Sequence, residues 1–300
     1  MANPLHRPYP SVQFPAMRHI LPRSRLLHFS MLIGCILIAV TGGIAWHDTM
    51  RPPVIRTLDI ALPGLPKNSP PLRLILISDI HVAGPDMPPS RVRRIADQIN
   101  ALKPDIIILA GDVTSDKRTA TRIYSTPESV APLATLKARL GKIAVAGNHD
   151  HWRGIACVHA SLLDAGFVVL TNEARKIGPI VIGGLDDDFT GHADLPATLH
   201  AMDALPGPKV LISHSPDPFA DLRPGRLLML AGHTHCGQIG YPWGGSPATM
   251  SRYGDRYACG VIHENGNTLV VSAGLGTSVL PLRFLVPPDA WAVHATSTAE

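Results

Sequence analysis

The feature that most constrains this chain is a series of short apolar runs, each followed at once by a residue able to bind a metal ion. The last run, residues 227–231, has the character of a buried strand and stops at Gly232-His233-Thr234-His235. Imidazole is the commonest neutral metal ligand, and a loop lets two rings turn toward one point. An isolated His-x-His pair also occurs on ordinary surfaces, so its meaning depends on the other runs.

Four earlier apolar runs end in the same way. Residues 72–78, 105–110, 142–146 and 210–213 lead into Asp79-Ile80-His81, Gly111-Asp112, Gly147-Asn148-His149-Asp150 and His214. In an open α/β sheet, ligands collect beyond the carboxyl ends of the strands, so side chains far apart in the sequence can converge. A single Asp after a strand is usually a turn former, but five ends of this kind in one chain indicate a shared site.

The side chains at these five ends offer imidazole nitrogens, carboxylate oxygens and an amide oxygen. They are Asp79, His81, Asp112, Asn148, His149, His214, His233 and His235. Such a mixture suits Mn, Fe, Zn or Co better than the all-oxygen sites of Ca or Mg. The number of ligands exceeds what one tetrahedral ion needs. We therefore predict two divalent ions that share a carboxylate.

Helical patterns fill the intervals between the runs. Apolar residues recur at helical spacing in residues 90–102, and similar patterns predict helices over 127–141, 157–165 and 196–205. Further strands are expected at 54–62, 167–170 and 177–183. Residues 259–263 and 268–272 flank Asn265-Gly266 and predict a β-hairpin. This alternation of strands and helices is typical of an α/β fold.

The order and spacing of the five ends resemble the signature of the calcineurin-like metallophosphoesterases, over about residues 72–290. Residues 232–238 and the later Gly274-Leu275-Gly276 further resemble a small bacterial phosphodiesterase branch with a membrane anchor or export signal. That branch has relatives that cleave UDP-2,3-diacylglucosamine, and Cys236 stands where it often shows glycine. The resemblance implies an α/β four-layer sandwich, in which two mixed β-sheets are flanked by helices and the metals lie at one edge.

The resemblance also implies how the ligands are divided. One ion would be held by Asp79, His81, Asp112 and His235, and the second by Asp112, Asn148, His214 and His233. A hydroxide that bridges the two ions would attack the phosphorus in line, so no protein nucleophile is required. His149 has no metal role in this scheme and is the expected general acid for the leaving alkoxide.

Four further residues each have two interpretations. Asp150 either orients the ring of His149 by accepting from its other ring nitrogen or caps a helix. Arg283 either meets a substrate phosphate with its guanidinium or forms a structural ion pair. Trp152 and Trp243 either line a pocket or pack internally.

The N-terminal region predicts a membrane anchor. Residues 26–46 contain no Asp, Glu, Lys or Arg and are long enough to cross a bilayer. Trp46 suits the membrane interface, and the arginines before the segment predict a cytoplasmic N-terminus. We expect a single-pass protein of the bacterial inner membrane with its catalytic domain on the periplasmic side. A cleaved signal peptide ending at residues 43–45 is the alternative.

The sequence thus divides into four parts. Residues 1–25 are expected to be a disordered basic tail, 26–46 a transmembrane helix, 47–70 a proline-rich tether with an opening strand, and 71–300 the metallophosphoesterase domain. Cys35 lies in the membrane segment. A disulfide among Cys157, Cys236 and Cys259 is possible outside the cytoplasm, but the sequence does not assign the pair.

The distribution of charge argues against nucleic acid as a partner. The formal net charge is +4, but residues 1–51 hold five arginines and one acid, so the remaining bases and acids balance. A nucleic-acid-binding domain would carry the excess on its folded body. We predict a dinuclear metal-dependent hydrolase of a phosphodiester or pyrophosphate, on a small-molecule or lipid-linked envelope substrate. The alternatives are a nuclease of the same fold and a non-catalytic metal-binding scaffold.

Overall fold

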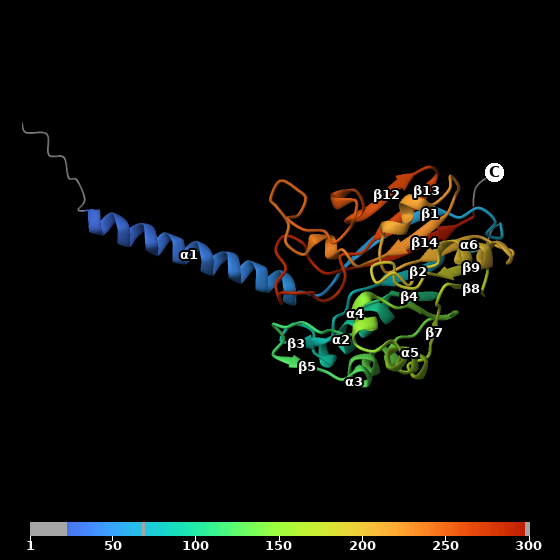
Figure 1. Cartoon of the computed structure of the whole chain (residues 1–300), viewed down its shortest axis with the longest axis horizontal. Coiled ribbons are helices and arrows are strands. Elements are labelled where there is room, and N and C mark those ends of the chain that lie inside the picture. Colours follow the sequence, from blue (N-terminus) through green and yellow to red (C-terminus); the bar gives the residue numbers. More distant parts are fainter. Residues whose placement is uncertain (1–22, 68–69, 298–300) are drawn as a thin grey trace, which may run out of the picture. The chain divides into compact units, whose positions relative to one another are not determined.

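The computed structural model describes residues 23–67 and 70–297, and two six-stranded sheets dominate it (Figure 1). The first sheet has the strand order β1 (Val54–Ala61), β14 (Asp289–Thr296), β2 (Leu72–Ile77), β4 (Ile106–Ala110), β6 (Gly141–Val145), β7 (Phe167–Val169). Strands β2, β4, β6 and β7 run parallel, while β14 is antiparallel to β2 and parallel to β1. The sheet is therefore mixed, as predicted.

The second sheet is also mixed. Its order is β12 (Gly260–Glu264), β13 (Asn267–Val271), β11 (Leu228–Ala231), β10 (Lys209–Ile212), β9 (Ile180–Gly184), β8 (Glu173–Ile177). The four inner strands are parallel and the two edge strands are antiparallel to their neighbours. A small antiparallel two-stranded sheet of β3 (Ala83–Gly84) and β5 (Arg122–Ile123) is separate from both large sheets.

Side chains from both sheets form one central apolar layer, which includes Leu76, Ile108, Ile182 and Leu230. On its outer face the first sheet packs against α2 (Pro89–Ala101), α3 (Thr126–Val130) and α5 (Ile155–Asp164) (Figure 1). The second sheet packs against α6 (Leu195–Asp203) and the 3₁₀ turns η2 (Asp217–Asp221) and η4 (Gly254–Tyr257). This is the predicted four-layer α/β sandwich. Buried parallel strands need apolar residues on both faces, which is why the runs in the sequence are continuous rather than alternating.

Three elements differ from the prediction. The helix expected over 127–141 ends at Val130 and continues as the 3₁₀ turn η1 (Ala131–Thr135), because Pro132 lacks a donor for an α-helical bond. The strand expected at 177–183 is a hairpin, β8 and β9, that turns at Gly178. Strand β14 was not predicted from the sequence, yet it lies inside the first sheet between β1 and β2.

The N-terminal helix α1 (Arg23–Met50) begins within the expected tail and extends beyond the expected span. It is long and apolar enough to cross a membrane. The rest of the predicted tail, residues 1–22, lies outside the described residues. Residues 43–300 form one compact unit, so the segment expected to be a tether is part of the domain. Thr49 is buried there, and its hydroxyl accepts a hydrogen bond of 2.6 Å from the backbone of Arg283.

Candidate metal centre

The seven predicted ligands meet at the carboxyl ends of the strands. Asp79 and His81 follow β2, Asp112 follows β4, Asn148 follows β6, His214 follows β10, and His233 and His235 follow β11. All seven side chains are buried. Three overlapping sets of three residues have ligand atoms within 4.8 Å of one another: Asp79, His81 and His235; His81, Asp112 and His149; Asp79, Asp112 and His214.

One half of the centre gathers around His81. Its Nε2 lies 3.0 Å from Nε2 of His235 and 3.5 Å from Oδ2 of Asp112. Nε2 of His235 in turn lies 3.5 Å from Oδ1 of Asp79. These are the separations expected for nitrogen and oxygen ligands that share an ion at roughly 2.0–2.2 Å.

The other half gathers around His214. Its Nε2 lies 3.0 Å from Oδ1 of Asn148, 3.1 Å from Nδ1 of His233 and 3.2 Å from Oδ2 of Asp112. The ring is fixed from behind, since Nδ1 of His214 lies 2.8 Å from the carbonyl oxygen of Ala110. The Oδ2 atom of Asp112 is therefore within reach of both halves.

Burial keeps most of these imidazoles neutral. Desolvation lowers the pKa of His81 and His235 well below the usual value and lowers that of His233 to about 4. A neutral imidazole has a free lone pair, which is the form that binds a metal. Two neutral rings cannot both donate to each other across 3.0 Å, so the lone pairs that face one another at His81 and His235 suit a shared cation. The donor set thus fits a divalent metal.

His214 and Asp112 differ from the other residues because they form an ion pair with each other. Burial alone would lower the pKa of His214, but the charge of Asp112 and a hydrogen bond to it raise that pKa well above the usual value. Burial likewise would raise the pKa of Asp112, yet His214 holds it well below its usual range. For Asp79, burial dominates and raises the pKa to about 6.

The backbone at the ligands is strained. The φ angles of Asp79, His81, Asp112, His233 and His235 are all positive, between 47° and 71°. For residues other than glycine this conformation costs ~1–3 kcal/mol each and persists only where the surroundings enforce it, typically at functional sites. It lets the chain turn sharply after each strand and aim the side chain back toward the centre.

The glycines of the motifs are required by close packing on the carboxylates. A Cβ atom at Gly147 would overlap the carboxylate of Asp112, and one at Gly232 would overlap that of Asp79. These glycines therefore let neighbouring loops approach the two acidic ligands. This explains why Gly-Asn-His and Gly-His-Thr-His occur as units.

His149 lies beside the centre, but its partner is not the predicted one. Its ring lies 4.6 Å from that of His81, and its Nδ1 lies 2.5 Å from Oδ1 of Asp116. The carboxylate of Asp150 points away from the ring and accepts from the backbone amides of Asp112, Val113, Thr114 and Gly147. The orienting role proposed for Asp150 is therefore wrong, and the capping alternative is correct.

The substrate role proposed for Arg283 is also contradicted. Its side chain is fully buried, and its guanidinium donates to the carbonyl oxygens of Ala273 (2.6 Å) and Gly276 (2.9 Å). Its Nη2 lies 3.4 Å from Nδ1 of His235. Burial lowers the pKa of Arg283 to about 10. Arg283 thus supports the backbone behind His235 and does not face a substrate.

Cys236 forms a disulfide, one of the pairings that the sequence left open. Cys236 is bonded to Cys259, 23 residues later, with a Cα–Cα distance of 4.7 Å. The bond ties the loop of His235 to the start of β12. The remaining cysteines, Cys35 and Cys157, are free.

Two exposed aromatic side chains flank the centre. The ring of Trp152, at the end of α4 (Asn148–Trp152), lies 4.8 Å from that of His149, and Phe189 lies 4.8 Å from His233. The two aromatic rings are 6.3 Å apart. Of these, Trp152 was considered in the sequence and Phe189 was not, because nothing in its local sequence places it near the histidines.

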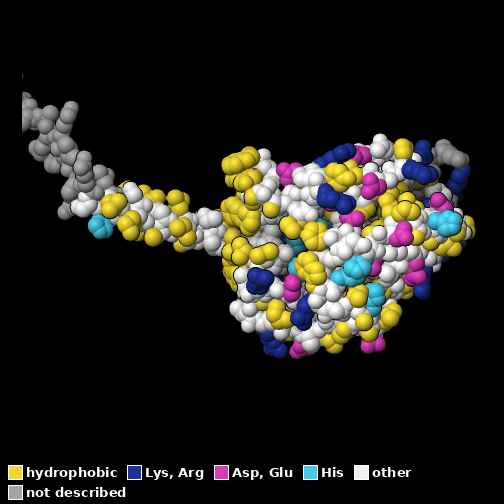
Figure 2. All heavy atoms as spheres, in the orientation of Figure 1, with side chains coloured by type: hydrophobic (Ala, Val, Ile, Leu, Met, Phe, Trp, Pro, Cys, Tyr) yellow, Lys and Arg dark blue, Asp and Glu magenta, His cyan; other side chains and the backbone are white. Residues whose placement is uncertain are grey.

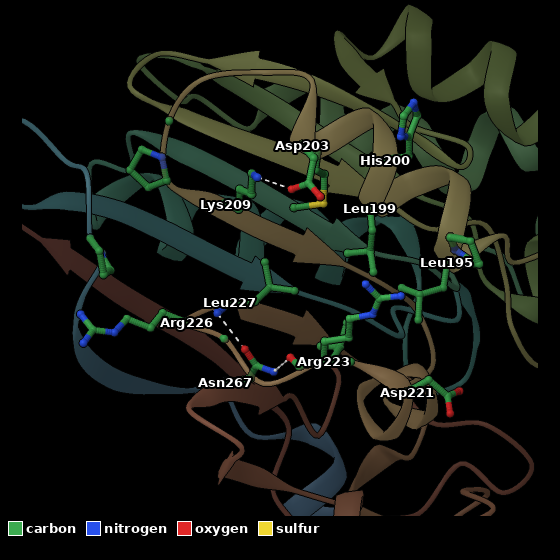
Figure 3. A pocket seen from close by; sticks show the side chains of 17 residues that line it. Leu195, Leu199, His200, Asp203, Lys209, Asp221, Arg223, Arg226, Leu227 and Asn267 are labelled. Carbon is green, nitrogen blue, oxygen red and sulfur yellow. Dashed lines mark hydrogen bonds and ion pairs between the residues drawn. The ribbon is translucent and has the colours of Figure 1, made fainter.

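A separate pocket of about 970 Å³ lies at the opposite ends of the strands (Figure 3). It is bordered by Lys209 at the start of β10 and by Leu227 just before β11. Two of its polar side chains are engaged within the protein: Asn267 accepts from the backbone amide of Leu227 and donates to the carbonyl of Arg223, and Lys209 pairs with Asp203. Its lining includes none of the predicted metal ligands, so the pocket is separate from the metal centre.

Comparison with known proteins shows that this chain is similar to metallophosphoesterases. The calcineurin-like phosphoesterase model matches residues 72–245. The metallophosphoesterase YkuE of Bacillus subtilis is 31% identical over 83% of this chain and 88% of its own length. A transmembrane protein with a metallophosphoesterase domain from Danio rerio is 30% identical over 84% of this chain, and this chain spans 60% of its length.

Among solved structures, the NAD nucleotidase of Haemophilus influenzae is similar, with 15% identity and a TM-score of 0.47 over 68% of this chain and 45% of its own. That resemblance is too distant to bear on the substrate. The residues matched by the family model, 72–245, include all seven predicted metal ligands. The chain belongs to the calcineurin-like phosphoesterase family, whose members are metal-dependent phosphoester hydrolases.

Proposed function

We propose that this chain hydrolyses a phosphodiester or pyrophosphate at a centre of two divalent ions. Asp79, His81, Asp112 and His235 would hold one ion, and Asp112, Asn148, His214 and His233 the other. The observation that carries the proposal is the position of Asp112, whose Oδ2 lies 3.5 Å from His81 and 3.2 Å from His214. A carboxylate that faces both groups can serve both ions.

The bound ions would supply Lewis-acid stabilisation of the phosphoryl oxygens and lower the pKa of an attacking water. The chain itself supplies proton transfer to the leaving group. Asp116 accepts from Nδ1 of His149, which leaves Nε2 as the nitrogen able to carry the transferred proton. The neutral amide oxygen of Asn148 adds no negative charge to the centre, which favours an anionic substrate.

The aromatic pair next to the centre indicates what the rest of the substrate is like. Trp152 is 54% exposed and Phe189 is 46% exposed, so both offer apolar surface beside the histidines. A flat or apolar leaving group would gain contact area there. We propose a small-molecule or lipid-linked substrate of the envelope, with no nucleic acid.

We further propose that α1 anchors the domain in the bacterial inner membrane, with the N-terminus in the cytoplasm and the domain on the periplasmic side. The arginines before the apolar segment favour this orientation. The disulfide between Cys236 and Cys259 favours it as well, since such bonds persist in oxidising compartments. The buried Thr49 at the end of α1 favours a retained anchor over a cleaved leader.

The test is an activity and metal assay of the full chain in detergent. A para-nitrophenyl phosphodiester should be hydrolysed, chelation should abolish the activity, and Mn, Fe, Zn or Co should restore it. Metal analysis should find two ions per chain. A protein that holds its metals and hydrolyses neither this ester nor nucleotide-sugar, lipid or single-stranded DNA esters would instead be a scaffold.

A further inference from the structure

Two neighbouring segments of the domain surface are apolar and carry no exposed charge. Residues 238–250 contain no charged side chain. Residues 276–288 contain Arg283 alone, and it is buried. Charged residues make up 17% of the whole chain, so two such stretches are unusual for surface loops. We refer to them together as the apolar loops.

Hydrogen bonds join the apolar loops into one surface. The backbone amide of Gly240 donates to the carbonyl of Phe284 (2.8 Å). The side chain of Gln238 donates to the carbonyls of Leu280 and Leu282, each at 2.9 Å, and accepts from the amide of Ser278 at 2.8 Å. The loops are therefore held together by Gln238, the last residue of the Gly-His-Thr-His-Cys-Gly-Gln motif.

Large hydrophobic side chains project from this surface into solvent. The exposed ones are Trp243 (81%), Val279 (70%), Met250 (58%), Leu280 (48%), Leu285 (46%) and Tyr241 (41%). The rings of Tyr241 and Trp243 stack, with centroids 5.2 Å apart. Contiguous apolar surface of this kind marks an interaction site on a soluble domain, and paired Trp and Tyr side chains are typical of the membrane interface.

The apolar loops meet the chain where the membrane helix ends. The amide of Leu285 donates to the carboxylate of Asp48 (3.1 Å), and that of Arg283 donates to the hydroxyl of Thr49 (2.6 Å). Trp46, in the same helical turn, is 41% exposed. Figure 2 shows hydrophobic side chains gathered on the side of the domain where residues 43–50 join it.

We propose that the apolar loops dip into the interfacial region of the lipid bilayer in which α1 is anchored. Residues 43–50, the last part of α1, belong to the same compact unit as the apolar loops, so this surface is attached within a few residues of the membrane-spanning segment. Without lipid, the exposed apolar side chains would face water. In the bilayer interface, their apolar parts leave water and the indole N–H of Trp243 keeps a polar partner.

The contact also brings the metal centre close to the membrane. Arg283 connects the two regions. Its backbone amide donates to the hydroxyl of Thr49 near the end of α1, and its Nη2 lies 3.4 Å from Nδ1 of His235. One residue thus separates the end of the membrane helix from a metal ligand. A phosphoester in a lipid headgroup would reach the centre without leaving the bilayer surface.

The experiment measures tryptophan emission of the full chain in lipid nanodiscs made with acyl-brominated phospholipid, which quenches only indoles that contact lipid. We expect Trp46 and Trp243 to be quenched. The variant Trp243→Phe should lose about half of the quenched emission, Trp46→Phe about half, and the double variant nearly all. Trp243 is mostly exposed, so its replacement by Phe leaves the fold intact.

The proposal is overturned if Trp243→Phe leaves the quenched emission unchanged, because Trp243 would then lie in water. No activity is measured, so this result is independent of whether the chain proves to be a hydrolase. Quenching of Trp243 in an inactive protein would support the membrane contact and count against the proposed function alone.

Discussion

Strands β10 and β11 lead into candidate metal ligands at their carboxyl ends, whereas their amino ends border a pocket that contains none of those ligands. At their carboxyl ends, His214 and His233 face other ligand atoms at 3.0–3.2 Å, and the ring of His233 has a pKa near 4. At their amino ends, Lys209 and Leu227 border a pocket in which Lys209 pairs with Asp203 and the amide of Leu227 donates to Asn267 (Figure 3). Both ends belong to the same buried sheet.

The difference shows where the chain departs from low-energy local structure. Positive φ angles, crowded glycines and buried imidazoles that face one another are concentrated at the carboxyl ends. Natural proteins retain such features where a site requires them and compensate elsewhere in the fold. Substitutions at the two ends should therefore act on different properties, with activity affected at one end and modest stability effects at the other.

The largest effect is expected from Asp112→Ala. Both halves of the centre lose a shared carboxylate, so hydrolysis of a phosphodiester should fall below detection and metal content should drop from two ions toward zero. Phosphodiesterase assays and metal analysis of the same preparation measure the two quantities. Normal activity with a full metal content would refute the bridging role of Asp112.

The next effect is expected from His149→Ala, which removes the proposed acid and not a ligand. Activity should fall ~10²–10⁴-fold, as is usual for loss of general acid–base help, with the metals retained. The loss should be greatest for substrates with poor leaving groups. Asp116→Asn should slow the same substrates by a smaller factor, because it alters only the partner of Nδ1. A His149 variant that loses its metals would show a ligand role instead.

The sequence predicted which side chains would converge, because each candidate ligand directly follows a strand. A buried run, a glycine and a His or Asp stand next to one another in the chain, so Asp79, Asp112 and His235 are identifiable from the sequence alone. The family resemblance then supplied the division of ligands between two ions, which spacing alone does not give. The same apolar segments of the sequence also predicted most strands of the two sheets.

The contacts that were missed depend on tertiary structure. Asp150 is adjacent to His149, but α4 is helical there, and neighbouring residues on a helix do not face each other. The actual partner, Asp116, is 33 residues away in a loop. Arg283 was misjudged because a charged residue is seldom fully buried. Strand β14 was missed because its small and apolar residues show no alternation.

A third prediction concerns the disulfide that supports the carboxyl end. Replacing Cys236 and Cys259 by serine frees a loop with a sequence separation of 23 and should lower the free energy of unfolding by roughly 3 kcal/mol. Urea unfolding of the full chain in detergent measures the change. Cys157→Ser is the matched control, because Cys157 is free and exposed and its replacement should leave stability unchanged. Equal stability of the two variants would show that the bond contributes nothing to folding.

The smallest effect is expected at the amino ends, from Asp203→Ala. The side chain of Asp203 is 73% exposed and pairs with Lys209, so the pair resembles other surface ion pairs. Such pairs contribute about 0.2–1 kcal/mol to stability. Because this pocket lies at the strand ends remote from the metal ligands, kcat/KM for a phosphodiester should stay within experimental error of the unaltered chain. A tenfold loss of kcat/KM would mean that a change at the amino end of β10 reaches the metal centre at its carboxyl end. The two ends would then not differ in their effect on activity.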